Sequence, residues 1–580
     1  MTRDIDPATK ADEAGIGPAQ TGAQTQWLTL WLTLLAVVLA LALLAPGVVP
    51  ITEMEHDVLH LMDAIARRDA GQLAHVDFMT PMGDLGIEMM AFWRRVFDLP
   101  FGMSMLMGNV AAVAMTLPLA IWAGASRLGL RAGLALGAWS LLMAAALSWR
   151  VDGAATTFAM SYNRWSWALA APLLTLFLAP PRDPGRRTDL IDAIAIGLSA
   201  AALAWIKVSY AAALLPVWAL WAVLTGRMRA AAWSAAIGGV AFLGFAAALT
   251  GSLGGAVTQV AAYAADLLFV AGSTLRPSPG VAPLHLLASP GHAAGAFACM
   301  MAAVILLAAR LRALAAVWLA ALFAITMMSW QNFGNDLLGV VAFGAAMPAA
   351  AAMVARAAPD LKVAGRPAGV ALRALAGLVF VLGLQQVLFM QHTVAAGWRV
   401  SLGRTDAPLA YIGAPDLRFD KSVSGIVGAL TMQRAETAVD PDALTGRERV
   451  VLGFKGEREI MGIPMPECQI RHGWAQMWQE LKTAWDARPD LAGRTVIGAD
   501  VINPGWLLLG APPQVGAPIW HYDALGPALA AADLLAVSRC PVSSLDRNMI
   551  LDEAVVAGLP LRRVLSTDFW EVFEIGDAPR

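Results

Sequence analysis

The chain has 580 residues, of which 58% are hydrophobic and only 14% are charged, and its mean hydropathy is +0.60. Soluble domains carry about 25% charged residues, so this composition excludes an ordinary soluble protein and indicates a polytopic membrane protein. The formal net charge is −2 and there is no basic tail, so we expect no nucleic-acid partner.

Apolar runs long enough to cross a bilayer, about 17 to 25 residues each, follow one another through the first two thirds of the chain. They predict a polytopic α-helical membrane protein with about eleven transmembrane helices, near 27–49, 103–122, 132–149, 164–180, 189–206, 208–225, 232–250, 293–309, 313–329, 337–355 and 374–393.

Arginine and lysine mark every second short connection between these runs, at 127–131, 182–187, 227–229, 310–312 and 356–373. All five connections face the cytoplasm if the N-terminus does, as the positive-inside rule requires. The first run has no cleavage site behind it, so we interpret it as a retained anchor after a disordered cytoplasmic tail, residues 1–26. An odd number of helices then places the C-terminus outside.

The composition changes after Trp398, and residues 397–580 are enough for a soluble periplasmic α/β domain. Short β-rich runs at 449–454, 494–501, 506–511 and 533–538 predict strands, and residues 473–487 predict a helix. The domain contains neither a GxGxxG nor a P-loop motif. A disulfide between Cys468 and Cys540 is an open possibility in an oxidising compartment, whereas Cys299 falls in a membrane helix.

The first outer loop contains an unusual group of polar residues, "MEHDVLHLMDAIARRDAGQLAHVDFMTPMG" at 54–83. A helix over 56–68 would place five apolar residues on one side and six polar ones on the other. We expect it to lie flat at the membrane surface and to present a carboxylate there. The alternative is a solvated helix face without a function. The polar side would carry His56, Asp57, His60, Asp63, Arg67 and Arg68.

Acidic residues at the membrane surface suit the transfer of a sugar from a lipid phosphate. That reaction needs a general base for the acceptor hydroxyl and cations for the departing phosphate. Asp57 or Glu55 could be the base. Arg164, Lys207 and Arg276 lie at outer helix ends, where the positive-inside rule disfavours them, so they are candidates for binding the phosphate of the substrate.

The stretch "EHDVLHLMDAIARRDAG" followed by "HVDFMTP" resembles the first outer loop of GT-C superfamily glycosyltransferases, of the bacterial protein mannosyltransferase and aminoarabinose transferase type. The resemblance implies a GT-C-like domain over 27–396 with its first periplasmic loop at 50–102. It also implies inverting transfer from a polyprenyl-phosphate sugar, with a first-loop acid as base. The usual Asp-Glu pair of that family falls here on His56 and Asp57. Asp57 is therefore the first candidate base and Glu55 the second, with His60 one turn further on to orient the base.

Two further polar groups on the outer face are candidate substrate-binding residues. His75 and Asp77 lie in the first loop, after the predicted helix 56–68. A second polar island, "SWQNFGND" at 329–336, provides Gln331, Asn332 and Asp336 for hydrogen bonds to a sugar. The alternative for this island is an ordinary polar hairpin turn.

An O-antigen ligase or polymerase, a polytopic transporter and a structural scaffold are the competing classes. A transporter usually carries charges at mid-membrane depth and an inverted repeat, and neither is visible. The acidic loop directly after the first helix favours a glycosyltransferase. The richness in Ala, Gly and Arg indicates a bacterial protein, so we expect the inner membrane. Its expected partners are a polyprenyl-phosphate sugar, a glycan, lipid or protein acceptor, and membrane lipids. No metal-ligand cluster appears, so we expect no cofactor, and the use of a divalent metal stays open.

The orientation can be tested with reporter fusions. A reporter fused after Gly403 should be active outside the cytoplasm and one fused after Arg229 should be active inside, because the arginine-rich connections fix the topology. A cytoplasmic signal from the Gly403 fusion would reverse the side on which all candidate residues lie.

Overall fold

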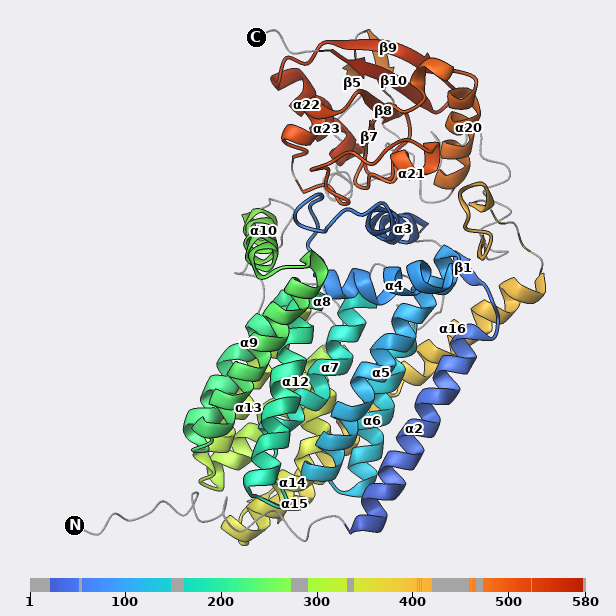
Figure 1. The fold of residues 1–580 in the computed structure, drawn as a ribbon. Helices are drawn as coiled ribbons and strands as arrows, with labels where there is room; N and C mark the ends of the chain where they lie inside the picture. The colour runs from blue at the N-terminus through green and yellow to red at the C-terminus, as the bar shows by residue number, and fades with distance from the viewer. Residues whose placement is uncertain are drawn as a thin grey trace.

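The computed structural model describes residues 21–576, except 52–54, 148–160, 273–289, 331–337, 420–457, 466–472 and single positions 404, 406, 408, 461 and 523. A helical bundle forms one part, and a smaller part that contains a sheet lies beyond one end of it (Figure 1). Helix α2 begins at the opposite end of the bundle. This architecture agrees with the predicted membrane domain followed by an α/β region.

Every predicted apolar run coincides with a helix or helix pair of the bundle, so the helical prediction is confirmed. Among the described residues, nine helices are long and apolar enough to cross a membrane, when α15 and α16 are taken as one. The bundle consists of α2 (Gly22–Leu44), α5 (Phe101–Arg127), α6 (Leu130–Ala145), α7 (Ser161–Leu178), α8 (Arg186–Leu224), α9 (Met228–Thr250), α12 (Pro290–Ala308), α13 (Arg312–Trp330), α14 (Val340–Ala357), α15 (Ala368–Gly383) and α16 (Gln385–Gly403).

Helix α8 is two antiparallel arms, 186–206 and 208–224. The backbone at Lys207 is not helical, with φ −157° and ψ 99°. Beyond the second arm, the Arg227 guanidinium lies 3.2 Å from Asp189 and 3.3 Å from Asp192, both at the start of the first arm. The two ends of α8 therefore meet at one end of the bundle, and Lys207 occupies the tip of the hairpin at the other. The two spans predicted at 189–206 and 208–225 are these arms.

Three helices lie across the end of the bundle that faces the sheet: α3 (Glu55–Asp69), α4 (Asp84–Phe97) and α10 (Leu253–Gly272) (Figure 1). Helix α10 lies between the predicted spans 232–250 and 293–309, where we predicted no span. Residues 253–272 are apolar enough to form a helix, and three polar side chains on one face of it bond to neighbouring segments.

The C-terminal part is built on a four-stranded sheet of order β7-β8-β10-β9. Strands β7 and β8 are parallel, and the other two pairs are antiparallel. A separate hairpin, β5 (Arg458–Ile460) and β6 (Ile463–Met465), precedes it. The sheet strands are β7 (Val496–Ala499), β8 (Leu534–Ser538), β9 (Leu561–Ser566) and β10 (Trp570–Ile575), and the helices are α20 (Trp474–Asp486), α21 (Gly505–Leu509), α22 (Pro527–Ala531) and α23 (Ser544–Val556).

The pattern of apolar residues predicted some elements of the C-terminal part correctly. The runs at 494–501 and 533–538 contain β7 and β8, and 473–487 contains α20. The run at 506–511 is not a strand: it belongs to α21, which buries Trp506 and Leu509 on one short helical turn. The run at 449–454 lies outside the described residues. Strands β9 and β10 and helix α23 were not predicted.

The chain after the bundle is tied back to the end of the first helix. Strand β4 (Leu417–Phe419) pairs in parallel with β1 (Val49–Ile51). The Asp416 carboxylate accepts the Met103 N–H at 2.6 Å, at the start of α5. A short hairpin, β2 (Lys362–Val363) and β3 (Arg366–Pro367), joins α14 to α15, and the 3-10 turns are Ala410–Ile412 and Pro489–Leu491.

The cysteines are consistent with an oxidising environment for the C-terminal part. Cys540 is disulfide-bonded, whereas Cys299 is a free thiol buried in α12. Cys468 lies outside the described residues, so its pairing with Cys540 stays a prediction.

Candidate functional site

Helix α3, predicted as the active-site helix, lies between the end of the bundle and the C-terminal part (Figure 1). All of its residues are buried except His56, Arg68 and Asp69. The polar side was expected to face solvent or a docking substrate. That expectation was wrong, because Asp63 and Arg67 of this side bond to the C-terminal part and Arg68 bonds to α4 of the bundle end.

Glu55 begins α3, and its carboxylate caps α20. Its oxygens accept the backbone N–H groups of Gly473 at 2.9 Å, Trp474 at 3.2 Å and Ala475 at 2.6 Å. These donors belong to the first turn of α20, where a negative charge is favoured by the helix dipole. Burial nevertheless raises the pKa of Glu55 to about 7, against the effect of the three N–H bonds. Glu55 therefore joins the two parts of the protein.

Asp63 and Arg67 extend the same contact further along α3. Asp63 accepts from Arg67 Nε and from the indole N–H of Trp506, both at 2.7 Å. Arg67 also donates to the backbone carbonyl of Gln514 at 2.9 Å. Burial raises the pKa of Asp63, and the charge of Arg67 opposes that rise. A buried carboxylate and guanidinium are stable here because each has a partner.

Asp57 points to a different side of α3. Successive residues of a helix are rotated by about 100°, so Asp57 lies about 200° from Glu55 and within about 20° of Arg68. Arg68 donates to Glu88 of α4 at 2.5 Å, which shows that this side of α3 faces the end of the bundle. Burial raises the pKa of Asp57, opposed by the charge of His56, whose Nε2 lies 3.5 Å away. A buried carboxylate with a raised pKa is a stronger proton acceptor than an exposed one.

His60 does not orient Asp57 in this arrangement. Its ring packs against Trp520, with centroids 5.3 Å apart, and neither ring nitrogen has a hydrogen-bond partner among the described residues. Burial, followed by the charge of His56, lowers the pKa of His60 to about 3, so the ring is neutral. His56 is the histidine adjacent to Asp57.

Two of the three predicted cations lie around the start of α7. Lys207, at the tip of the α8 hairpin, donates to the Asn163 side-chain oxygen and lies 4.7 Å from the ring of Tyr162. Arg164 is buried and donates to the Gln386 amide oxygen at 3.1 Å. The Gly83 N–H donates to the Ile206 carbonyl at 3.2 Å, so the first loop touches the hairpin tip. Arg276 lies outside the described residues.

An apolar cavity of about 310 Å³ opens within the bundle beside the hairpin. It is lined by α7, both arms of α8 and α9, with almost no polar surface. Its walls include Leu203 and Ala211, each four residues from Lys207. The cavity can therefore hold a hydrocarbon chain whose charged end lies near the tip of the hairpin.

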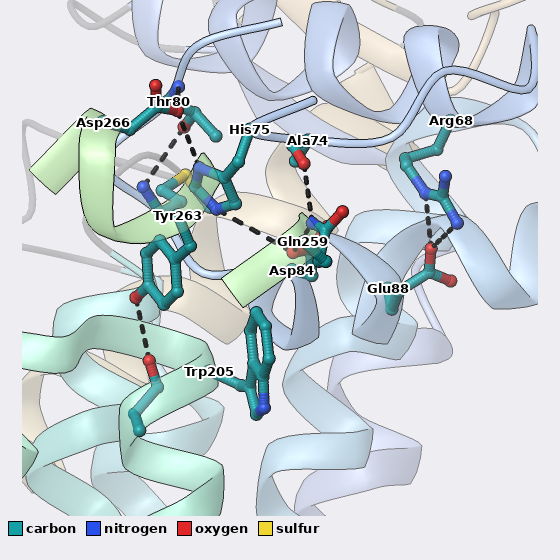
Figure 2. Close-up of polar contacts among 12 residues, drawn as sticks. Arg68, Ala74, His75, Thr80, Asp84, Glu88, Trp205, Gln259, Tyr263 and Asp266 are labelled. Carbon is teal, nitrogen blue, oxygen red and sulfur yellow. Dashed lines mark hydrogen bonds and ion pairs between the residues drawn. The ribbon is translucent and has the colours of Figure 1, made fainter. Parts of the chain in front are cut away.

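His75 and Asp77 hold the first loop in place. The His75 backbone is left-handed, with φ 69°, and its Nδ1 lies 2.8 Å from Asp266 of α10 (Figure 2). Its ring stacks on Tyr263, with centroids 4.3 Å apart. Asp77 accepts the Leu73 N–H at 2.7 Å, and its carbonyl accepts the Gly516 N–H. Both residues shape the loop through bonds within the protein.

The second polar island is not part of the described site, because Gln331, Asn332 and Asp336 lie outside the described residues. The structure instead adds residues of α10 and the C-terminal part, Gln259, Tyr263, Asp266 and Trp520, that sequence reasoning missed. The spacing of 259, 263 and 266 is helical, so the pattern could have indicated a helix with one polar face between the spans predicted at 232–250 and 293–309.

Comparison with known proteins finds similarity only among solved structures. No family model matches the chain, and no curated protein matches it. The chain is similar to ArnT from Cupriavidus metallidurans in the apo state, with 13% identity, a TM-score of 0.43, and coverage of 95% of this chain and 98% of that one. The same protein bound to undecaprenyl phosphate gives 12% identity, a TM-score of 0.41 and the same coverage.

The oligosaccharyltransferase of Archaeoglobus fulgidus, in a complex with Zn and sulfate, gives 10% identity and a TM-score of 0.38, over 87% of this chain and 67% of that one. Identities and TM-scores of this size carry no argument about mechanism, which rests on the side chains of the site.

Replacing Glu55 with Ala should loosen the C-terminal part from α3, because three N–H groups of α20 lose their acceptor. Loss of such a cap costs about 1 kcal/mol, and burial of unpaired donors adds to it. The thermal unfolding temperature of the protein in detergent should fall.

The pH dependence of the unfolding temperature tests whether Glu55 is the group that stabilises this contact. Because docking raises the pKa of Glu55 from 4.5 to about 7, the docked state binds the proton more tightly. Its contribution to stability is complete below about pH 4.5 and is lost as the pH rises through about 7. Glu55→Ala should remove this decrease of the unfolding temperature with rising pH. Glu553→Ala is the matched control, since Glu553 instead caps Leu525 and Gly526. An unchanged slope in Glu55→Ala would contradict this assignment.

Proposed function

We propose that this protein is a glycosyltransferase of the bacterial inner membrane that moves a sugar from a polyprenyl-phosphate donor to an acceptor hydroxyl at the periplasmic face. The acceptor is a glycan, a lipid or a protein. The observation that supports the proposal is Asp57, a buried carboxylate on the side of α3 that also carries Arg68, whose partner Glu88 belongs to α4 at the end of the bundle.

Asp57 serves as the general base. The acceptor oxygen forms a bond to the anomeric carbon while its proton passes to the Asp57 carboxylate. The bond between the anomeric carbon and the phosphate oxygen breaks, and the polyprenyl monophosphate leaves with the electron pair. Glu55 is less suited to this role, since both of its oxygens already accept N–H groups of α20.

Lys207 and Arg164 stabilise the leaving phosphate. Both lie near the start of α7, and they donate to the neutral amide oxygens of Asn163 and Gln386, respectively. A positively charged side chain at this position attracts an anion such as the leaving phosphate. The apolar cavity beside the hairpin then takes part of the polyprenyl chain, so that headgroup and chain are bound by neighbouring parts of α8.

Asp57→Asn is expected to reduce the rate of sugar transfer by a factor on the order of 10² to 10⁴, because the amide keeps the size but cannot take a proton. The measurement is glycan formation by the purified protein with a mixture of polyprenyl-phosphate sugars. In the wild type, transfer should be lost as the pH falls through the raised pKa of Asp57.

Asp69→Asn provides the matched control on the same helix, since Asp69 is partly exposed and paired with Arg94. It should keep nearly normal activity. If Asp57→Asn stays active and Glu55→Gln does not, the base is Glu55. If both stay active, the first loop does not supply the base.

Lys207→Ala should weaken binding of undecaprenyl phosphate by a factor on the order of 10 or more, because a cation opposite a phosphate is lost. Binding of undecaprenol, which lacks the phosphate, should be unchanged. Native mass spectrometry can compare the two lipids, and Lys362→Ala, an exposed lysine in β2, is the control. Equal loss for both lipids would mean that Lys207 shapes the cavity and does not bind phosphate.

A further inference from the structure

Helix α10 has the length and apolar composition of a transmembrane span but does not run with the bundle. In Figure 1 the view is nearly along the axis of α10, whereas α9 beside it runs along the bundle. Only residues 251 and 252 separate the two helices. The chain therefore turns sharply after α9 and continues across the end of the bundle.

One face of α10 holds the first loop. Gln259 Nε2 donates at 2.7 Å both to the Ala74 carbonyl and to Asp84 (Figure 2). The Tyr263 hydroxyl donates to the Ala204 carbonyl at 2.8 Å, and Asp266 pairs with His75. These side chains bond to other parts of the protein, and Gln259 and Tyr263 are buried.

The opposite face is an apolar stripe that no described part of the chain covers. Its residues recur every three or four positions and fall within about 80° of the helix circumference. Leu253 is 76% exposed, Val257 67% and Leu268 76%, and Ala261 and Ala264 lie exposed between them. The stripe contains no charged side chain. A helix whose polar face bonds to protein and whose apolar face is exposed needs an apolar neighbour on the exposed face.

We propose that α10 lies in the lipid headgroup layer, with this stripe in contact with the acyl chains of the outer leaflet. The occupant is lipid because α10 directly follows α9, a membrane-spanning helix that exposes apolar side chains, with Val240 75% and Leu243 47% exposed. A helix that lies flat buries its apolar side at the boundary between headgroups and acyl chains, while its polar side stays on the protein. The inference depends on the membrane position of the bundle and not on the reaction that the protein catalyses.

Fluorescent probes on single introduced cysteines test this placement in the full-length protein reconstituted into phosphatidylglycerol and phosphatidylethanolamine vesicles. Cys299 is buried, Cys540 is disulfide-bonded and Cys468 is its predicted partner, so none of the three should take the probe. Val257→Cys and Leu268→Cys report on the stripe. Val240→Cys on α9 is the reference for the acyl region, and Val555→Cys on α23, 76% exposed, is the reference for water.

The probes on α10 should be quenched most by lipids that carry a nitroxide near the headgroup, at least twofold more than by lipids with a nitroxide near the end of the chain. The Val240 probe should show the opposite order, and the Val555 probe should respond only to aqueous iodide. Response of the α10 probes to iodide alone would place α10 in water. Strongest quenching by the deep nitroxide would make α10 a spanning helix, and no quenching by either agent would mean that protein covers the stripe. Each of these three results overturns the proposal.

Discussion

The contact between the Glu55 carboxylate and the first turn of α20 is the interaction on which the site depends. It fixes the start of α3 to a helix more than 400 residues away in sequence. A buried acid of this kind is tolerated only with partners, and those partners belong to the C-terminal part. Asp63 and Arg67 repeat the same arrangement along the helix. The position of α3, and with it that of Asp57, therefore requires the C-terminal part as much as the bundle.

Two acids separated by one residue have different roles because the helix turns between them. Glu55 faces the C-terminal part, where N–H donors surround it, whereas Asp57 faces the end of the bundle with His56 beside it. Burial raises the pKa of both. Only Glu55 is held by three backbone bonds, so its oxygens are already used in the resting structure. Environment, and not residue type, distinguishes the structural acid from the candidate base.

Much of the bundle could be predicted from sequence because hydropathy is a local property. The two spans on either side of Lys207 were recognised as separate although no loop divides them. The docking of α3 could not be predicted in this way, since Glu55 and Gly473 are far apart in the chain and neither carries a pattern that points to the other. The same reason explains α21: a short apolar run becomes helix or strand according to what packs on it.

Lys207 and Asp57 do not pair with each other, and the proposed reaction requires this. If Lys207 paired directly with Asp57, the ion pair would lower the pKa of the acid and reduce its strength as a base. Lys207 instead contacts Asn163 and the face of Tyr162, and Asp57 contacts His56. At the opposite end of the bundle, where no chemistry is proposed, Arg127 pairs directly with Asp192, as an ion pair that serves packing should.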